Sequence, residues 1–313
     1  MSIESRAHMG RVPKMTQGGV TASMQSVGST GIIKPAAHRS IAAALTNNFT
    51  QLDDGAYSVS PLQLPYYFSS PSPEIPLLID DYRAGGYNYR MAETMLNESF
   101  NVDDRNGARC TCLVTRGLAP DPCILKVRQL QRIENNQAFE QFKAYETRVA
   151  DRLTRLSGGL QVSGMSASEL DGRHGWLKRL ADKNELSQPS NTVYLLHGTR
   201  AHNIEQICQE GLKKGRGRDG MYGSGIYFTD SSCKAYQYSG AGGCIIVCRV
   251  VLGSVELLHA NGDRLGPSAG FDSCHAVKGW TQGSSGPQVH NEFIVYNDCA
   301  CYPEFVITCE LEA

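Results

Sequence analysis

The 313-residue sequence has almost no net charge, since 30 lysines and arginines face 31 aspartates and glutamates. A protein that coats nucleic acid carries a large positive excess, so this balance argues against that class and leaves only local basic patches open. No apolar run approaches the length of a membrane-spanning helix. The first thirty residues also lack the hydrophobic segment of a Sec signal peptide. We therefore expect neither Sec-dependent secretion nor insertion into a membrane.

The eleven cysteines form no C-x-x-C pair, the spacing most typical of a zinc site. The closest pairs are Cys110/Cys112, Cys244/Cys248 and Cys299/Cys301. We therefore expect no metal, and we interpret the cysteines as buried thiols of a protein in a reducing compartment. This interpretation favours the cytoplasm or the nucleus.

The first 75 residues are poor in acids and rich in residues that do not build a core. Glu4 is the one acidic residue among the first fifty, and five prolines follow between residues 61 and 76. Such a stretch buries little apolar surface, so residues 1–80 are predicted to be a low-complexity leader, disordered or loosely docked. Its composition leaves organelle targeting or non-Sec export open. Residues 81–313 are predicted to form the folded domain.

The rest of the chain shows helical patterns first and strand patterns later. Helices are predicted over 89–100, 138–153 and 203–211, the second capped by Asn135 or Asn136, the third by Asn203 and ended by Gly211. Strands are predicted over 123–133, 191–199, 244–253, 292–298 and 304–312, with a loop over 156–175. This order predicts an α+β fold with largely antiparallel sheets rather than repeated βαβ units.

One glycine motif resembles a nucleotide-binding fingerprint but stands in the wrong context. Residues 215–220 (GRGRDG) match G-x-G-x-x-G, a motif that works only between a strand and a following helix. Here it follows a predicted helix, so we do not expect a Rossmann site. The overlapping segment KKGRGR (213–218) is interpreted as a basic loop, either solvated or facing a phosphate.

Three residues near strand ends are candidates for a functional site. His197 ends a buried strand and precedes Gly198, at which a ligand could approach the backbone. Tyr227 follows a Gly-x-Gly step, which favours a chain that bends around a ligand. Glu292 begins an apolar strand, an unusual position for an acid. Each of these patterns alone also fits a purely structural role.

The order of the motifs along the chain makes them more specific together than any one of them is alone. The segments LHGT, G-x-GIYF, K-x-x-Q-Y, NEFIVY and YPEFVIT follow one another between residues 196 and 308. In this order and spacing they resemble the catalytic domain of the poly(ADP-ribose) polymerases, over roughly residues 90–313, and most of all its tankyrase branch. The resemblance implies an α+β ADP-ribosyltransferase fold, in which two largely antiparallel sheets with flanking helices form an NAD+-binding cleft.

The resemblance also implies a role for each candidate residue. His197, Tyr227 and Glu292 correspond to the family's His-Tyr-Glu triad, and His197 would bond the adenosine ribose. The Gly198 backbone would hold the nicotinamide carboxamide, with Thr199 among the NAD+-binding residues. Tyr227 and Tyr238 would sandwich the nicotinamide ring through cation–π attraction. Glu292 would stabilise the positive charge that develops on the ribose.

The function implied is transfer of ADP-ribose from NAD+ to protein side chains, with release of nicotinamide. Glu292 permits elongation to poly(ADP-ribose) without proving it. The implied partners are acceptor proteins, and no nucleic-acid module is evident. Two departures from the family pattern stand out. Ala235 replaces a serine that bonds the carboxamide in much of the family, and the zinc-bearing insertion of tankyrases is missing between Tyr238 and Cys244.

Two other functions were weighed. Ala235 leaves open a catalytically weak or inactive module of the same fold that binds NAD+ or a partner. A cysteine–histidine hydrolase would need a thiolate beside an imidazole. The adjacent residues Cys274 and His275 do not make such a pair by adjacency alone, so we set this function aside.

Overall fold

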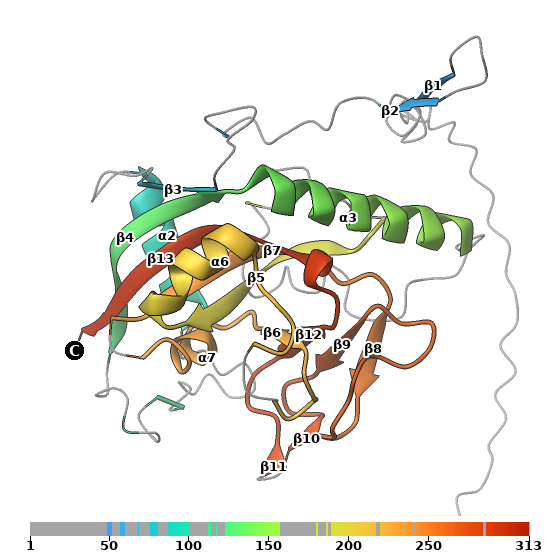
Figure 1. Cartoon of the computed structure of the whole chain (residues 1–313). Coiled ribbons are helices and arrows are strands. Elements are labelled where there is room, and N and C mark those ends of the chain that lie inside the picture. Colours follow the sequence, from blue (N-terminus) through green and yellow to red (C-terminus); the bar gives the residue numbers. More distant parts are fainter. Residues whose placement is uncertain are drawn as a thin grey trace, which may run out of the picture. The chain divides into compact units, whose positions relative to one another are not determined.

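The computed structural model describes residues 49–51, 57–59, 68, 76–80, 87–100, 112–113, 117, 123–156, 180, 186, 189–216, 220–240, 242–283 and 286–312. The chain divides into two units, Met1–Pro61 and Leu62–Ala313. In the first unit, β1 (Phe49–Gln51) pairs with β2 (Tyr57–Val59) in antiparallel fashion. The second unit contains the helices and the two larger sheets (Figure 1).

The larger sheet has five strands in the order β3-β4-β13-β7-β5 and is antiparallel throughout. Its strands are β3 (Leu77–Asp80), β4 (Ile124–Glu134), β13 (Cys301–Glu312), β7 (Cys244–Val251) and β5 (Thr192–Thr199). All eight residues of β7 are buried. A run of valine, isoleucine and cysteine suits that position, because a strand covered on both faces needs apolar side chains on both.

Two long helices pack on this sheet. Helix α2 (Tyr87–Glu98) contacts β4, and α3 (Asn136–Leu156) contacts β13. The face of α3 predicted from periodicity is confirmed, because its buried residues include Phe139, Phe142, Val149 and Leu153. The predicted cap is also confirmed, since Asn135 Oδ1 accepts a hydrogen bond of 2.9 Å from the backbone nitrogen of Ala138.

The smaller sheet has four strands in the order β6-β12-β9-β8. Its strands are β6 (Ile226–Phe228), β12 (Glu292–Val295), β9 (Ser273–Ala276) and β8 (Val255–Leu258). The pairs are antiparallel except for β8 with β9. A hairpin of β10 (Gln282–Gly283) and β11 (Gly286–Pro287) lies between β9 and β12 in the chain. The predicted α+β class with two largely antiparallel sheets is therefore confirmed.

Backbone hydrogen bonds join the two sheets at one point. The amide of Leu196 on β5 donates to the carbonyl of Thr229, and the amide of Thr229 donates back, at 2.8 and 2.9 Å. This bridge holds the end of β5 beside the residues that follow β6. The short helices α6 (Ile204–Glu210) and α7 (Ser232–Tyr236) come directly after these two segments.

Several boundaries differ from those predicted. Strand β12 ends at Val295, before the short 3₁₀ helix η3 (Asp298–Ala300), whereas β13 begins at Cys301. Gly211 ends α6 with φ 74°, as predicted, but Asn203 makes no capping hydrogen bond. Its side chain is diverted, because Nδ2 donates to the hydroxyl of Thr199, the last residue of β5, at 3.1 Å.

Two features reach into the predicted leader. Strand β3 pairs with β4, and the Phe68 ring lies 5.6 Å from that of Phe139. Paired structure thus extends back at least to Leu77, while the boundary between residues 80 and 81 stays a prediction. Most of the predicted loop 156–175 and residues 217–219 of the GRGRDG motif lie outside the described residues. None of the helices in the described ranges combines the length and apolar character needed to cross a bilayer.

Candidate active site

His197 lies on β5, next to the bridge between the sheets. Its Nδ1 atom is 2.8 Å from the backbone carbonyl oxygen of Tyr227. A carbonyl can only accept, so Nδ1 carries the proton and Nε2 keeps a lone pair. Burial lowers the pKa of His197, although the hydrogen bond to Tyr227 opposes the shift. His197 is therefore neutral at pH 7, and its Nε2 can accept a hydrogen bond from a hydroxyl group.

Tyr227 lies on β6 in a fixed orientation. Its hydroxyl donates to the Gly223 carbonyl at 2.7 Å and accepts from the Tyr222 amide at 2.9 Å. The rings of Tyr222 and Tyr227 are nearly parallel, with centroids 6.5 Å apart. Burial is the main cause of the raised pKa of Tyr227, and the charges of Glu292 and Tyr238 add to it. The ring is thus a preformed wall, and Glu292 and Tyr238 lie in the same neighbourhood.

Tyr238 follows α7 and is far more open to solvent than Tyr227. Its exposed fraction is 57%, and the ammonium nitrogen of Lys234 lies 5.4 Å from the centroid of its ring. An exposed aromatic ring is a suitable outer wall for a flat, positively charged ligand, whereas the neighbouring Lys234 charge would repel such a ligand. The described contacts do not pair the rings of Tyr227 and Tyr238, so the sandwich stays a prediction.

Glu292 begins β12, where the side chain is 5% exposed, and its Oε1 forms an ion pair with Lys234. Strand β12 lies between β6 and β9, so the carboxylate is carried on the same sheet as Tyr227. Burial works against the charge on Lys234, but the Glu292 carboxylate and Tyr238 outweigh it and raise the pKa of Lys234. The described structure therefore places a cation directly against the candidate catalytic acid.

The residue before Glu292 is held by a small polar network. Asn291 donates through Nδ2 to an Asp230 carboxylate oxygen at 2.8 Å. Its Oδ1 accepts from the Lys278 amide at 2.9 Å and lies 3.2 Å from Nε2 of His275. This network fixes the start of β12 and so the position of Glu292.

The sequence alone predicts no role for Lys234 or Asn291. Both residues belong to motifs that resemble the family pattern, K-x-x-Q-Y and NEFIVY, and this is the sequence signal that points to them. The pairing of Lys234 with Glu292 joins residues 58 positions apart, which no local pattern indicates.

The glycines of the site make room for protein atoms, a reason that the sequence alone did not predict. A Cβ at Gly198 would lie 1.7 Å from the Ala235 carbonyl oxygen, inside α7. A Cβ at Gly225 would lie 2.2 Å from a methyl carbon of Ile294, and Gly223 has φ 82°. Gly198 thus lets β5 approach α7 closely. Its backbone contact with a carboxamide remains a prediction, as does the role of Thr199.

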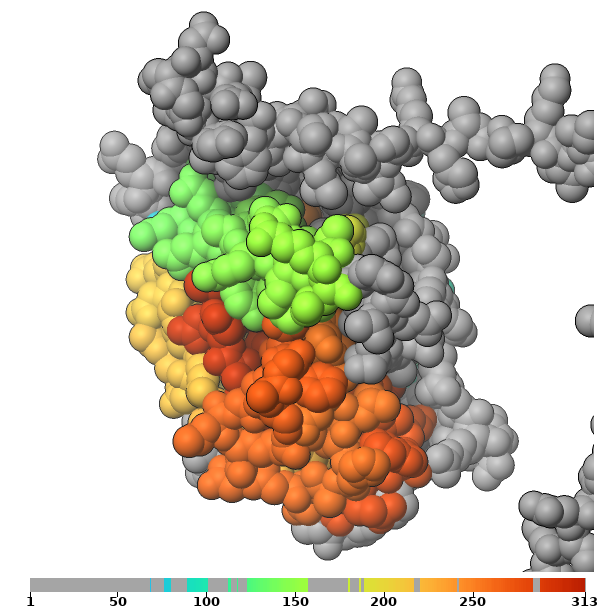
Figure 2. Space-filling model, turned by 90° about the vertical axis from the view of Figure 1, so that its right-hand side faces the viewer, coloured from blue at the N-terminus to red at the C-terminus, as the bar shows by residue number. Residues whose placement is uncertain are grey.

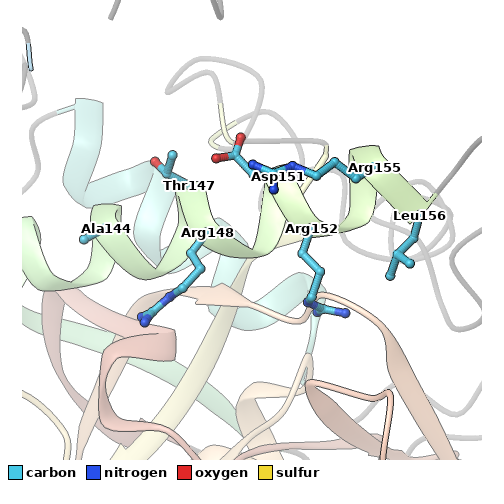
Figure 3. Close-up of a pocket in the computed structure, with 7 residues that line it drawn as sticks. All are labelled: Ala144, Thr147, Arg148, Asp151, Arg152, Arg155 and Leu156. Carbon is cyan, nitrogen blue, oxygen red and sulfur yellow. The ribbon is translucent and has the colours of Figure 1, made fainter. Parts of the chain in front are cut away.

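A surface hollow lies on another part of the molecule. It runs along the outer side of α3 and is lined by Ala144, Thr147, Arg148, Asp151, Arg152, Arg155 and Leu156 (Figure 3). Figure 2 shows the green surface of α3 bordering the orange surface of the segment after β7, where Arg152 forms an ion pair with Asp272. No candidate site residue lines this hollow, so it is not the predicted NAD+ cleft.

Comparison with known proteins agrees with the fold. Residues 111–289 match the family model described as the poly(ADP-ribose) polymerase catalytic domain. That range includes His197, Tyr227 and Tyr238 and ends before Glu292.

Two curated relatives share the name "Protein mono-ADP-ribosyltransferase PARP4". The mouse protein (Mus musculus) is 34% identical over 126 residues, which are 36% of this chain and 6% of that protein. The human protein (Homo sapiens) is 32% identical over 137 residues, 39% of this chain and 8% of that protein. The chain thus aligns with a small part of either relative, and the tankyrase likeness stays a prediction. Because the family model covers more than half of it, the chain belongs to the poly(ADP-ribose) polymerase catalytic domain family.

Proposed function

We propose that this chain transfers ADP-ribose from NAD+ to protein side chains and releases nicotinamide. The observation that carries the proposal is the neighbourhood of Glu292: a buried carboxylate at the start of β12, near Tyr227 and Tyr238 and opposite Lys234. A carboxylate beside aromatic walls suits a substrate whose leaving group is flat and cationic.

Each neighbour would contribute to NAD+ binding. Nε2 of His197 would accept a hydrogen bond from a hydroxyl of the adenosine ribose, which the neutral tautomer allows. The Gly198 backbone, with Thr199 beside it, would bond the nicotinamide carboxamide. Tyr227 and Tyr238 would lie against the two faces of the ring. Ala235 supplies no hydroxyl, and a missing hydrogen bond costs about 0.5–1.5 kcal/mol of binding free energy.

The chemistry would follow from charge. The bond between ribose C1′ and the nicotinamide nitrogen breaks, its electron pair leaves with nicotinamide, and positive charge develops on the ribose. An acceptor side chain then bonds to C1′, and its proton passes to water. Glu292 would stabilise the charged ribose through the 2′-hydroxyl, an interaction stronger in the transition state than in the ground state. Because Lys234 contacts Oε1, Oε2 would take the 2′-hydroxyl.

A second candidate is an NAD+-binding module without transfer. The ion pair with Lys234 favours it, because a carboxylate already neutralised by a cation stabilises a new positive charge less. The absence of a carboxamide-binding serine at Ala235 favours it as well.

One experiment separates these functions. The protein is incubated with labelled NAD+ and a cell lysate, and the labelled proteins are separated by size. A transferase labels discrete proteins and loses the label in Glu292→Gln, whereas a binding module retains NAD+ and labels nothing. Labelled ladders would indicate elongation, and single shifted bands would indicate mono-ADP-ribosylation.

A further inference from the structure

We propose that Cys112, Cys233 and His290 form a binding site for a divalent zinc-class ion. Their ligand atoms, two thiol sulfurs and one ring nitrogen, all lie within 4.8 Å of one another. The Cys233 sulfur is 3.8 Å from Nε2 of His290. Tetrahedral zinc binds sulfur at about 2.3 Å and imidazole nitrogen at about 2.0–2.1 Å, which sets neighbouring ligand atoms roughly 3.5–3.8 Å apart. The three atoms therefore need to close by about 1 Å at most to hold an ion.

The three ligands come from distant parts of the chain. Cys112 precedes β4, Cys233 lies in α7, and His290 stands two residues before β12. None of them belongs to a C-x-x-C pair, and for that reason the spacing of the cysteines predicted no metal. The trio is also separate from residues 239–243, where the zinc-bearing insertion of tankyrases would stand. Folding brings these three residues together although they are far apart in the sequence.

The chemistry of the three groups selects the ion. Two thiolates and a neutral imidazole are soft and borderline ligands, which suit zinc and exclude magnesium and calcium as preferred ions. Two thiolates also balance the charge of a divalent cation. The Ser231 Oγ atom lies 3.2 Å from the Cys233 sulfur, but its proton is donated to the Ser99 carbonyl at 3.1 Å, so it would donate to a thiolate only after giving up that hydrogen bond.

The three ligands differ in how deeply they are buried. Cys233 is fully buried, His290 is 5% exposed, and Cys112 is partly exposed. An ion can therefore enter from the side of Cys112, and water can fill the fourth position of the tetrahedron from there. The same burial argues against Cys233 and His290 as a catalytic thiolate–imidazole pair, because a substrate cannot reach a sulfur that has no exposed surface.

The position of the three ligands indicates how a bound ion would affect the candidate active site. Cys233 precedes Lys234, and His290 lies two residues before Glu292, so an ion would tie together the two segments that carry the ion pair of the candidate active site. The three ligands would then be positioning residues rather than catalytic ones. This consequence rests on the proposed function, whereas the metal site itself does not.

The first test measures metal content. The full chain is purified under reducing conditions with a tag that binds no metal, and bound metals are quantified by mass spectrometry. We expect roughly one zinc ion per chain. Cys112→Ser, Cys233→Ser and His290→Gln should each lose it, and Cys299→Ser, a partly exposed cysteine outside the trio, should retain it. In cobalt-loaded protein, a thiolate-to-cobalt charge-transfer band should appear and be absent from the Cys112→Ser variant.

The possible outcomes test the metal site independently of ADP-ribosyl transfer. Wild-type protein that binds neither zinc nor cobalt overturns the site, and so does a disulfide between Cys112 and Cys233 in the reduced preparation. Equal metal in Cys112→Ser and Cys299→Ser overturns it as well. Because Cys112 is partly exposed, its serine variant should keep the circular dichroism spectrum of the wild type. Bound zinc without ADP-ribosyl transfer would support the metal site and contradict the proposed function. Transfer without bound metal would contradict the metal site and support the proposed function.

Discussion

Glu292 and Glu304 are both buried glutamates that face a cation, yet their surroundings differ. Glu304 is 0% exposed and accepts hydrogen bonds from Arg249 Nε at 2.7 Å and Nη2 at 3.0 Å. The Tyr194 hydroxyl donates to it as well, at 2.6 Å. Glu292 instead meets the compact ammonium group of Lys234, through one of its two oxygens.

This comparison separates a structural carboxylate from one that can react. The guanidinium of Arg249 lies 5.6 Å from the Phe139 ring and 5.7 Å from the Tyr194 ring, so core atoms surround the Glu304 pair. The Glu292 pair lies beside the exposed ring of Tyr238, where a ligand can arrive. A carboxylate whose oxygens are taken by core donors stabilises the fold, whereas one with an available oxygen at the start of a strand can act on a substrate.

The largest expected effect is on the core pair. Glu304→Gln leaves the Arg249 charge buried without its counter-charge, and breaking such a pair costs about 3–5 kcal/mol of unfolding free energy. Urea unfolding followed by circular dichroism measures this loss. Glu292→Gln is the matched control, with a smaller expected loss because the flexible Lys234 side chain, 11% exposed, can turn its ammonium group toward solvent. Equal losses in the two variants would contradict the distinction.

The second-largest expected effect is a loss of transfer rate when Lys234 is replaced. Lys234→Met removes the cation that holds Glu292, and a hydrogen bond between charged groups is worth about 1.5–3 kcal/mol, or roughly a 10- to 150-fold loss of rate. Lys234→Arg should restore part of the rate. A Lys234→Met enzyme that transfers ADP-ribose at the native rate would show that the ion pair plays no part in catalysis.

The third effect concerns the outer wall. Tyr238→Ala removes one aromatic face and should weaken binding of a nicotinamide analogue by about 1–2 kcal/mol. Tyr238→Phe keeps the ring and should bind nearly as the wild type does. Calorimetric titration of the folded variants measures both. An unchanged affinity in Tyr238→Ala would contradict the sandwich.

The smallest effect is a pH dependence. Burial lowers the pKa of His197 in the folded protein below the ordinary value of about 6.5. The side chain therefore stays neutral at every pH above that lowered pKa. NAD+ affinity should stay constant over that range and fall by about 0.5–1.5 kcal/mol as the pH drops through the folded pKa, when Nε2 gains a proton and stops accepting. The same protonation removes stability at low pH, because the unfolded chain binds the proton more readily.

A titration of NAD+ affinity against pH measures this effect. His197→Leu should flatten the profile, whereas His202→Leu, at an exposed position, should leave it unchanged. A drop in affinity that survives in His197→Leu would assign the titration to another group.

Much of the fold was predictable because its signals are local. Periodicity gave the inner face of α3, a run of β-branched residues gave β7, and Gly211 marked the end of α6. Asn203 shows the limit, since the cap position was right but its side chain bonds Thr199. The boundaries of β12 and β13 depend on pairing with neighbouring strands, which a single segment does not reveal.

The site was only partly predictable, because its contacts are long-range. An acid at the start of an apolar segment describes Glu304 as well as Glu292, and the partners that tell them apart come from other strands and helices. The atom that a Cβ at Gly198 would meet is the Ala235 carbonyl oxygen, 37 residues away in sequence, and no local pattern indicates that contact. The Cys112, Cys233 and His290 trio likewise exists only once the chain has folded.

The central claim is that Glu292 acts on the ribose cation of the transition state. Glu292→Gln keeps the shape of the side chain and removes its charge, so the ADP-ribosyl transfer rate should fall about 100- to 1,000-fold. Affinity for NAD+ should change little, because the cation exists only near the transition state. Parallel measurement of single-turnover transfer and of NAD+ binding by calorimetry tests this directly. Transfer at the native rate, or a loss of rate explained entirely by lost binding, would contradict the account.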